Sequence, residues 1–162
     1  MKNFSKLIFL IFIISATSCQ KELEQEPHLI YYDNFYQTGD DALSAVNSVY
    51  DVLGYVNQYS SYLWLIQDIA SDDCNARATL NDPNLHEFNT YNIEPNNNYL
   101  GLIWQGSFLG ISRANVVMEK VPDIKMDSSL KQRILGEASF LRGLYYFNLV
   151  RLFGEVPLIT TP

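Results

Sequence analysis

The chain has 162 residues, 48% of them hydrophobic, and a formal net charge of −7 at pH 7. A chain of this length and hydrophobicity can bury one domain core, which excludes a disordered protein. Its acidic surface would be repelled by phosphate backbones and by anionic lipid headgroups. We therefore expect no nucleic-acid partner and no basic membrane-binding patch.

The first 18 residues have the pattern of an export signal. Lys2 and Lys6 make the start basic, and a continuous apolar run covers residues 7–14. The run is too short to span a bilayer, and small residues follow it, as in a secretory signal peptide. The stretch "ATSC" then resembles the bacterial lipobox, although Ala replaces the Leu that is common three residues before the Cys. We predict a lipoprotein signal peptide over residues 1–18 and lipidation of Cys19.

The alternative is an ordinary cleaved signal peptide followed by an unrelated cysteine. If Cys19 is acylated, Cys74 is the one remaining thiol, and no internal disulfide can form. Removal of the leader with its two lysines changes the formal charge from −7 to −9. Residues 19–37 begin with "CQKELEQEP", a polar composition that predicts a lipidated acidic tether and an irregular lead-in. This stretch resembles the acidic signals that send Bacteroidetes lipoproteins to the cell surface.

The remaining residues, 38–162, predict a mainly α domain. Thr38 and Asp41 have the spacing of a partial capping box, and Gly154 has the position of a helix stop. No alternating strand pattern is present. Apolar residues at helical spacing predict four helices, over residues 40–57, 62–71, 99–121 and 128–153.

The stretch between the second and third of these helices predicts a long loop. Residues 72–98 contain seven asparagines between Asn81 and Asn98, together with Pro83 and Pro95. We expect one short strand in it, near residues 87–93. Irregular loops of this length are uncommon in compact domains and often carry function.

The last predicted helix contains "GEASFLRGLYYFNLVRLFGEVPLI". Its charged residues make it unsuitable as a membrane span. Arg133 and Glu137 are four residues apart, so we expect an ion pair on the surface. Gly136 and Gly143 face nearly the same side, and each costs about 1 kcal/mol inside a helix. Two such glycines on one face predict that another helix approaches closely there.

The order of the motifs resembles the amino-terminal part of the SusD/RagB family. The motifs that support this resemblance are the lipobox, "DIASDD", "ISRANVVMEKVPD" and "EASFLRGLYYFNLVRLFGEVPLI". Gly143 stands where Ala is usual, and Glu155 where Asp is commoner. The resemblance implies tetratricopeptide-like helix pairs with long inserted loops, and the third and fourth helices here would form one pair. Family members continue for several hundred residues more, so residues 38–162 are expected to be an amino-terminal domain, truncated at its C-terminus.

By the same resemblance, the protein is an outer-membrane lipoprotein, lipid-anchored and exposed at the cell surface. It would capture oligosaccharides or peptides and deliver them to a SusC-like TonB-dependent β-barrel transporter, without catalysing a reaction. The alternative is a helical scaffold that docks on the transporter without touching ligand. The nature of the ligand, glycan or peptide, stays open.

Sugars are bound by aromatic faces and by hydrogen-bonding side chains, and both kinds of residue occur in and after the long loop. Each candidate has a structural alternative, such as a turn at residues 96–98, helix capping by the two aspartates or core packing of the tryptophan. A carboxylate pair for hydrolysis is the rival chemistry, but no nucleophile motif accompanies it. His28 and His86 lack partners at metal-ligand spacing, so we expect no metal and no cofactor. The candidate ligand-binding residues are Asp72, Asp73, Arg77, Asn96, Asn97, Tyr99 and Trp104.

Overall fold

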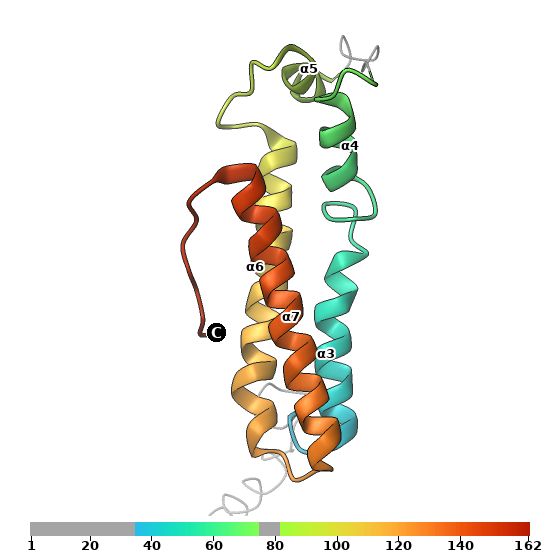
Figure 1. The fold of residues 1–162 in the computed structure, drawn as a ribbon, viewed down its shortest axis with the longest axis vertical. Helices are drawn as coiled ribbons and strands as arrows, with labels where there is room; N and C mark the ends of the chain where they lie inside the picture. The colour runs from blue at the N-terminus through green and yellow to red at the C-terminus, as the bar shows by residue number, and fades with distance from the viewer. Residues whose placement is uncertain (1–34, 75–81) are drawn as a thin grey trace, which may run out of the picture. The chain divides into compact units, whose positions relative to one another are not determined.

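The computed structural model describes residues 35–74 and 82–162. The chain divides into two compact units, residues 1–35 and 36–162, and the helices described below lie in the second. Three long helices pack side by side: α3 (Gly39–Leu53), α6 (Asn98–Lys120) and α7 (Ser128–Phe153). Helix α6 and helix α7 run in opposite directions (Figure 1), joined by the short 3₁₀ helix η2 (Val121–Asp123). The predicted mainly α class, with a helix pair at its C-terminal end, is confirmed.

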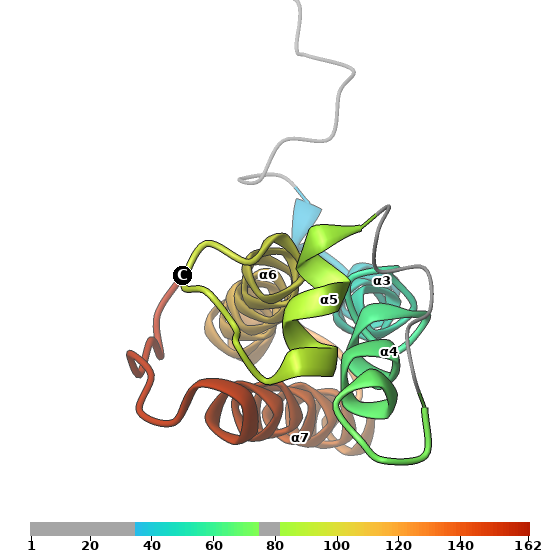
Figure 2. The same cartoon turned by 90° about the horizontal axis from the view of Figure 1, so that it is seen from above.

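Two shorter helices complete the described part of the chain. Helix α4 (Tyr62–Ile69) follows α3, and α5 (Pro83–Thr90) lies across the end of the bundle, as the view from above shows (Figure 2). Phe88 is the buried residue of α5 and joins a small core cluster with Leu63, Ile66 and Ile103. No helix among the described residues is long and apolar enough to cross a membrane.

The core is built from one apolar stripe on each long helix, because residues three and four positions apart share a helix face. Thr38 and Asp41 form the predicted capping box in front of α3. Asp127 caps α7, and Gly154, with φ of 75°, ends it as predicted. The buried stripes are Ala42, Ala45, Val46, Val49 and Val52 on α3; Ile103, Ile111, Ala114 and Val117 on α6; and Ile134, Ala138, Leu141, Tyr145 and Leu149 on α7.

The long asparagine-rich segment contains a helix, and the strand expected near residues 87–93 is wrong. Asp82 caps α5 by accepting hydrogen bonds from the backbone N–H groups of Asn84 and Leu85. Pro83 occupies the first helical position, where its missing N–H costs nothing. Tyr91 then ends the helix in the left-handed region, at φ of 55°.

The first helix is shorter than predicted, since α3 ends at Leu53 and not at Asn57. Gly54 caps it, and a turn follows in which the backbone N–H of Tyr59 donates to the carbonyl of Leu53. Gln58 lies at the centre of this turn and is fully buried; its Nε2 donates to the carbonyl of Ile103 on α6. A buried amide that finds its partner on a neighbouring helix fixes where the chain leaves α3.

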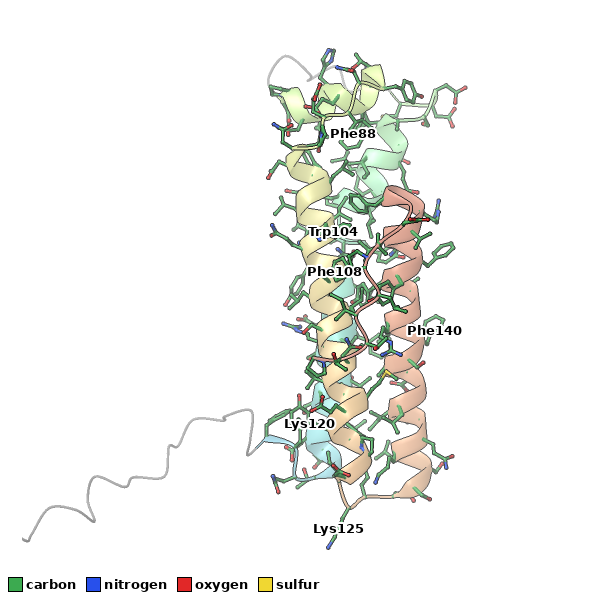
Figure 3. The ribbon with its side chains drawn as sticks, turned by 90° about the vertical axis from the view of Figure 1, so that its left-hand side faces the viewer. Phe88, Trp104, Phe108, Lys120, Lys125 and Phe140 are labelled. Carbon is green, nitrogen blue, oxygen red and sulfur yellow. The ribbon has the colours of Figure 1, made fainter. Side chains whose placement is uncertain are left out.

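The expected close approach at Gly136 and Gly143 is wrong. A Cβ built on either glycine meets no atom within 4 Å, and both glycines are exposed. They share the outer face of α7 with Phe140, whose side chain is 67% exposed and points away from the bundle (Figure 3). The close approach occurs on α6, where a Cβ on Gly110 would lie 2.3 Å from the ring of Tyr145. Arg133 and Glu137 do form the predicted pair, at 3.2 Å.

The last residues turn back after α7 and run beside the helix pair (Figure 1). Asn115 is 1% exposed, and its Nδ2 donates to the carbonyls of Ile159 and Thr161, each at 3.1 Å. Arg142 donates to Oδ1 of the same asparagine at 2.9 Å. Asn115 therefore connects α7 to the returning C-terminal segment.

Candidate functional site

Three of the polar residues predicted in the long loop lie on the surface. Asp72 and Asp73 follow α4 and are exposed, and the backbone N–H of Asp73 donates to Oγ of Ser71 at 3.3 Å. Asn96 is exposed in the turn before α6. Arg77 lies outside the described residues. Ligand binding by these four residues stays a prediction.

Asn97 is committed to internal contacts. It is 2% exposed and caps α6, since its Oδ1 accepts from the backbone N–H groups of Tyr99 and Leu100. Its Nδ2 donates to the carbonyl of Asn84 at 2.9 Å and to Oε2 of Glu87 at 2.7 Å. One amide thus satisfies the start of α6 and two acceptors on α5, which is the behaviour of a structural residue.

Tyr99 is the second link between α5 and α6. Its hydroxyl donates to Oδ2 of Asp82 at 2.6 Å, and its ring meets that of Tyr62 edge to face, with centroids 4.7 Å apart. Burial, followed by the hydrogen bond to Asp82 and the charge of that carboxylate, raises the pKa of Tyr99 to about 12. The phenol therefore stays protonated and keeps donating at any physiological pH.

Trp104 packs inside the helix pair. It is half-buried, with its ring centroid 4.8 Å from that of Phe108 and 5.0 Å from that of Phe153, the latter edge to face. Trp104 and Phe108 lie between α6 and α7 (Figure 3). These contacts agree with the packing alternative for Trp104.

The contact between Asn97 and Glu87 predicts a pH-dependent stability. The hydrogen bond from Asn97, and then that from the backbone N–H of Glu94, hold the pKa of Glu87 below its usual 4.5. A carboxyl with a lowered folded pKa stabilises the protein above its unfolded pKa and loses that contribution as pH falls through the folded value. Glu87→Gln should therefore destabilise the protein at pH 7, by an amount that shrinks below pH 4.5.

Urea midpoints of both proteins between pH 3 and pH 7 measure this difference. The Asn97→Ala background is the control, because the largest cause of the lowered pKa is absent there and the pH dependence of the difference should weaken. A Glu87→Gln effect that stays constant across the range would contradict the prediction.

Among the residues that the structure describes, a hollow suited to a ligand lies where α3 passes into α4. Its volume is about 550 Å³, within the range of small-molecule sites. Two other hollows have less suitable linings: a largely apolar one at the end of α7 and a smaller one of about 160 Å³ that includes Asn148 and Arg151. The lining residues of the first hollow are Gly54, Tyr55, Val56, Asn57, Tyr62 and Leu102. It is called the tyrosine hollow below.

Both aromatic walls of the tyrosine hollow are held in place by neighbours. The guanidinium of Arg113 lies 5.9 Å from the ring centroid of Tyr55 and donates to its hydroxyl at 3.4 Å. Arg113 is itself anchored by the carbonyl of Ser48, at 2.7 Å. The edge-to-face contact with Tyr99 supports Tyr62. The two rings are therefore oriented before any ligand arrives.

Asn57 provides the polar group of the hollow. Its Nδ2 donates to the carbonyl of Leu102 at 2.9 Å, whereas its Oδ1 is buried and has no hydrogen-bond partner among the described residues. Space for this amide exists because Gly106 on α6 has no side chain: a Cβ there would lie 2.9 Å from both amide atoms of Asn57. The hollow thus combines two aromatic rings, an amide and apolar side chains, without a charged residue.

None of the six predicted residues that the structure describes lines the tyrosine hollow. All of its lining residues except Leu102 stand in "GYVNQYSSY", where tyrosines and amides occur in a short connection between two helices. This clustering of tyrosines and amides is the sequence feature that could have indicated a binding site here. No group of side chains suited to a metal ion occurs among the residues that the structure describes.

Comparison with known proteins gives a consistent assignment. Residues 31–162 match the SusD-like family described as "Starch-binding associating with outer membrane". SusD-like proteins P38 and P25 of Formosa agariphila are 29% and 28% identical to the chain, which they match over 99% and 100% of its length. The chain spans about a third of each relative, 32% in both cases.

A solved structure agrees. The crystal structure of a SusD superfamily protein from Parabacteroides distasonis superposes with a TM-score of 0.61 at 29% identity, over 75% of this chain and 26% of that one. The family match covers most of the sequence, and the helical arrangement is shared with this neighbour. The chain therefore belongs to the SusD-like family.

Proposed function

We propose that the protein is a surface lipoprotein that captures glycans at the outer membrane and delivers them to a SusC-like TonB-dependent transporter. The observation that carries the proposal is the family match over residues 31–162, whose description combines starch binding with outer-membrane association. Because that description names binding and no reaction, we propose capture without catalysis. The tyrosine hollow supports a glycan over a peptide, since aromatic rings with an amide suit sugar rings and hydroxyls.

Attachment to the membrane is proposed through Cys19. The export signal over residues 1–18 and the lipobox-like "ATSC" support it, as does the acidic tether over residues 19–37. These segments lie outside the described residues apart from the end of the tether, so the proposal rests on sequence. Acylation of Cys19 would hold the helical domain at the surface of the membrane.

A scaffold that binds the transporter without contacting ligand is the second candidate. It is favoured by the outer face of α7, where the side chains of Phe140, Phe147 and Val150 are 67%, 57% and 53% exposed. Several exposed large apolar residues on one helix face are characteristic of an interaction surface.

A pull-down from the native outer membrane tests the proposal. The tagged full chain is extracted in detergent, and the recovered proteins are identified by mass spectrometry. We expect a large β-barrel transporter to co-purify with the wild type, and the Cys19→Ala variant to leave the membrane fraction and lose the barrel. Wild type recovered without a barrel would contradict delivery to a transporter. Wild-type membrane association that survives Cys19→Ala would contradict the lipid anchor.

A further inference from the structure

We infer that the tyrosine hollow is a subsite for one neutral pyranose ring of a glycan chain. The inference rests on the proposed glycan capture and goes beyond it by naming the residues and the sugar class. Its first support is the lining, in which Tyr55 and Tyr62 supply aromatic surface and Asn57 supplies the amide. Pyranose rings present C–H groups on their faces and hydroxyls at their edges, and these two kinds of group fit aromatic rings and an amide.

The charge of the lining selects the class of sugar. None of the six lining residues is ionisable near pH 7 as a cation or a carboxylate. Arg113, the cation behind Tyr55, is already engaged with the carbonyl of Ser48 and with the carboxylate of Asp51, at 2.7 and 3.5 Å. A uronate or sulfate in the hollow would lose water without gaining a counter-charge, on a protein whose formal net charge is −7. Neutral hexose units are therefore favoured over anionic ones.

The rigidity of the walls adds to the argument. Gln58, fully buried, ties the turn to α6 through the carbonyl of Ile103 at 3.1 Å and the hydroxyl of Ser107 at 3.3 Å. Arg113 and Tyr99 support the two ring walls from outside the hollow. Side chains that are already ordered lose little conformational entropy on binding, and preorganised sites bind more tightly for that reason.

Asn57 offers an unmet hydrogen bond. Its Oδ1 accepts from no described residue, and a buried acceptor without a donor destabilises the free protein. The oxygen lies in the wall of the hollow, where the bond from Nδ2 to the carbonyl of Leu102 holds the amide. A sugar hydroxyl reaches it through a small shift of that wall, and the new hydrogen bond would satisfy the acceptor.

Calorimetric titration of the full chain, in a detergent without a sugar headgroup, tests the assignment. The probes are maltohexaose, hexagalacturonate of matched length and a charged hexapeptide. We expect wild type to bind maltohexaose at least tenfold more tightly than either charged probe. Tyr62→Ala should weaken maltohexaose binding by about tenfold or more, the scale of effect when an aromatic side chain that stacks on a nucleic-acid base is lost. Tyr62→Phe keeps the ring and should weaken binding much less.

Gly54→Leu is the second variant, because it fills the hollow without removing a packing residue. Gly54 has φ of −78°, which any residue adopts, and the nearest atom to a Cβ there is the Asp51 carbonyl at 3.4 Å. We expect it to abolish maltohexaose binding at unchanged thermal stability. Phe140→Ala, on the outer face of α7, is the matched aromatic control and should leave the affinity for maltohexaose unchanged.

The outcomes separate the two proposals. Wild-type affinity for maltohexaose that survives both Tyr62→Ala and Gly54→Leu overturns the subsite and leaves glycan capture standing. Tighter binding of hexagalacturonate or of the peptide overturns the neutral-sugar assignment. Wild type that binds none of the three probes overturns both the subsite and capture by this chain.

Discussion

Replacing Gly110 with alanine is expected to destabilise the protein by about 3 kcal/mol, a large share of the stability of a domain this size. The added methyl would lie 2.3 Å from two ring atoms of Tyr145 and 2.7 Å from a third. Tyr145 has no exposed surface, and its hydroxyl donates to the carbonyl of Val49 on α3 at 2.8 Å. The ring therefore cannot move aside without breaking a buried hydrogen bond and separating three helices.

The electrostatics of Tyr145 point the same way. Burial raises the pKa of this phenol well above its usual value, and nearby Arg113 only partly opposes that effect. A neutral, donating hydroxyl is thus fixed between α7 and α3 at every physiological pH. Displacement of the ring would leave both the hydroxyl and the carbonyl unsatisfied, at a cost of about 1–3 kcal/mol for each such group.

Urea unfolding followed by circular dichroism measures the effect, with Gly101→Ala and Gly143→Ala as matched controls. Neither control position has an atom within 4 Å of the added Cβ. Alanine is about 1 kcal/mol better than glycine inside a helix, so both controls should be neutral or stabilising. Gly110→Ala should also cost much less in a Tyr145→Leu background, because the steric overlap is then absent. A full effect that persists in that background would contradict the mechanism.

The sequence determined the long helices well but not the face of α7 that meets its neighbours. Spacing placed Gly136 and Gly143 correctly on one side of the helix, yet aromatic residues occur on both sides. Tyr145 is buried, whereas Phe140 is 67% exposed. Periodicity gives the relative positions of residues on one helix, and the buried side is decided only by the other helices. Gly110 was the informative glycine, and its meaning depends on a ring 35 residues away.

In the rest of the chain, features that depend on neighbouring residues could be predicted from the sequence, whereas features that depend on distant contacts could not. Asp82 followed by Pro83 is a helix-start pattern, so the beginning of α5 could have been predicted from the sequence. The many asparagines of the segment favoured a loop instead. The tyrosine hollow was less accessible to sequence reasoning. Asn57 meets Leu102 across 45 residues, and that contact exists only because α6 passes beside the turn.

Replacing Asn97 with alanine is expected to cost about 2–3 kcal/mol, from the loss of a helix cap and of two donated hydrogen bonds. Asn97 caps α6 and donates to Asn84 and Glu87 on α5. Asn97→Ser should recover part of the loss, since serine restores the cap acceptor while the reach to α5 is gone. The exposed neighbour Asn96 is the matched control, and Asn96→Ala should change stability by less than about 0.5 kcal/mol.

Two measurements distinguish a structural Asn97 from a ligand-binding one. Urea unfolding gives the free-energy difference, and amide hydrogen exchange shows where it acts. We expect Asn97→Ala to increase exchange in α5 (Pro83–Thr90) and in the first turn of α6 more than in α3 or in α7, because those two segments meet at the lost amide. Unchanged stability with a large loss of glycan affinity would instead assign Asn97 to the ligand. All the polar contacts of the Asn97 side chain lie within the protein. We therefore expect Asn97→Ala to loosen α5 and to lower stability, without a direct effect on glycan affinity.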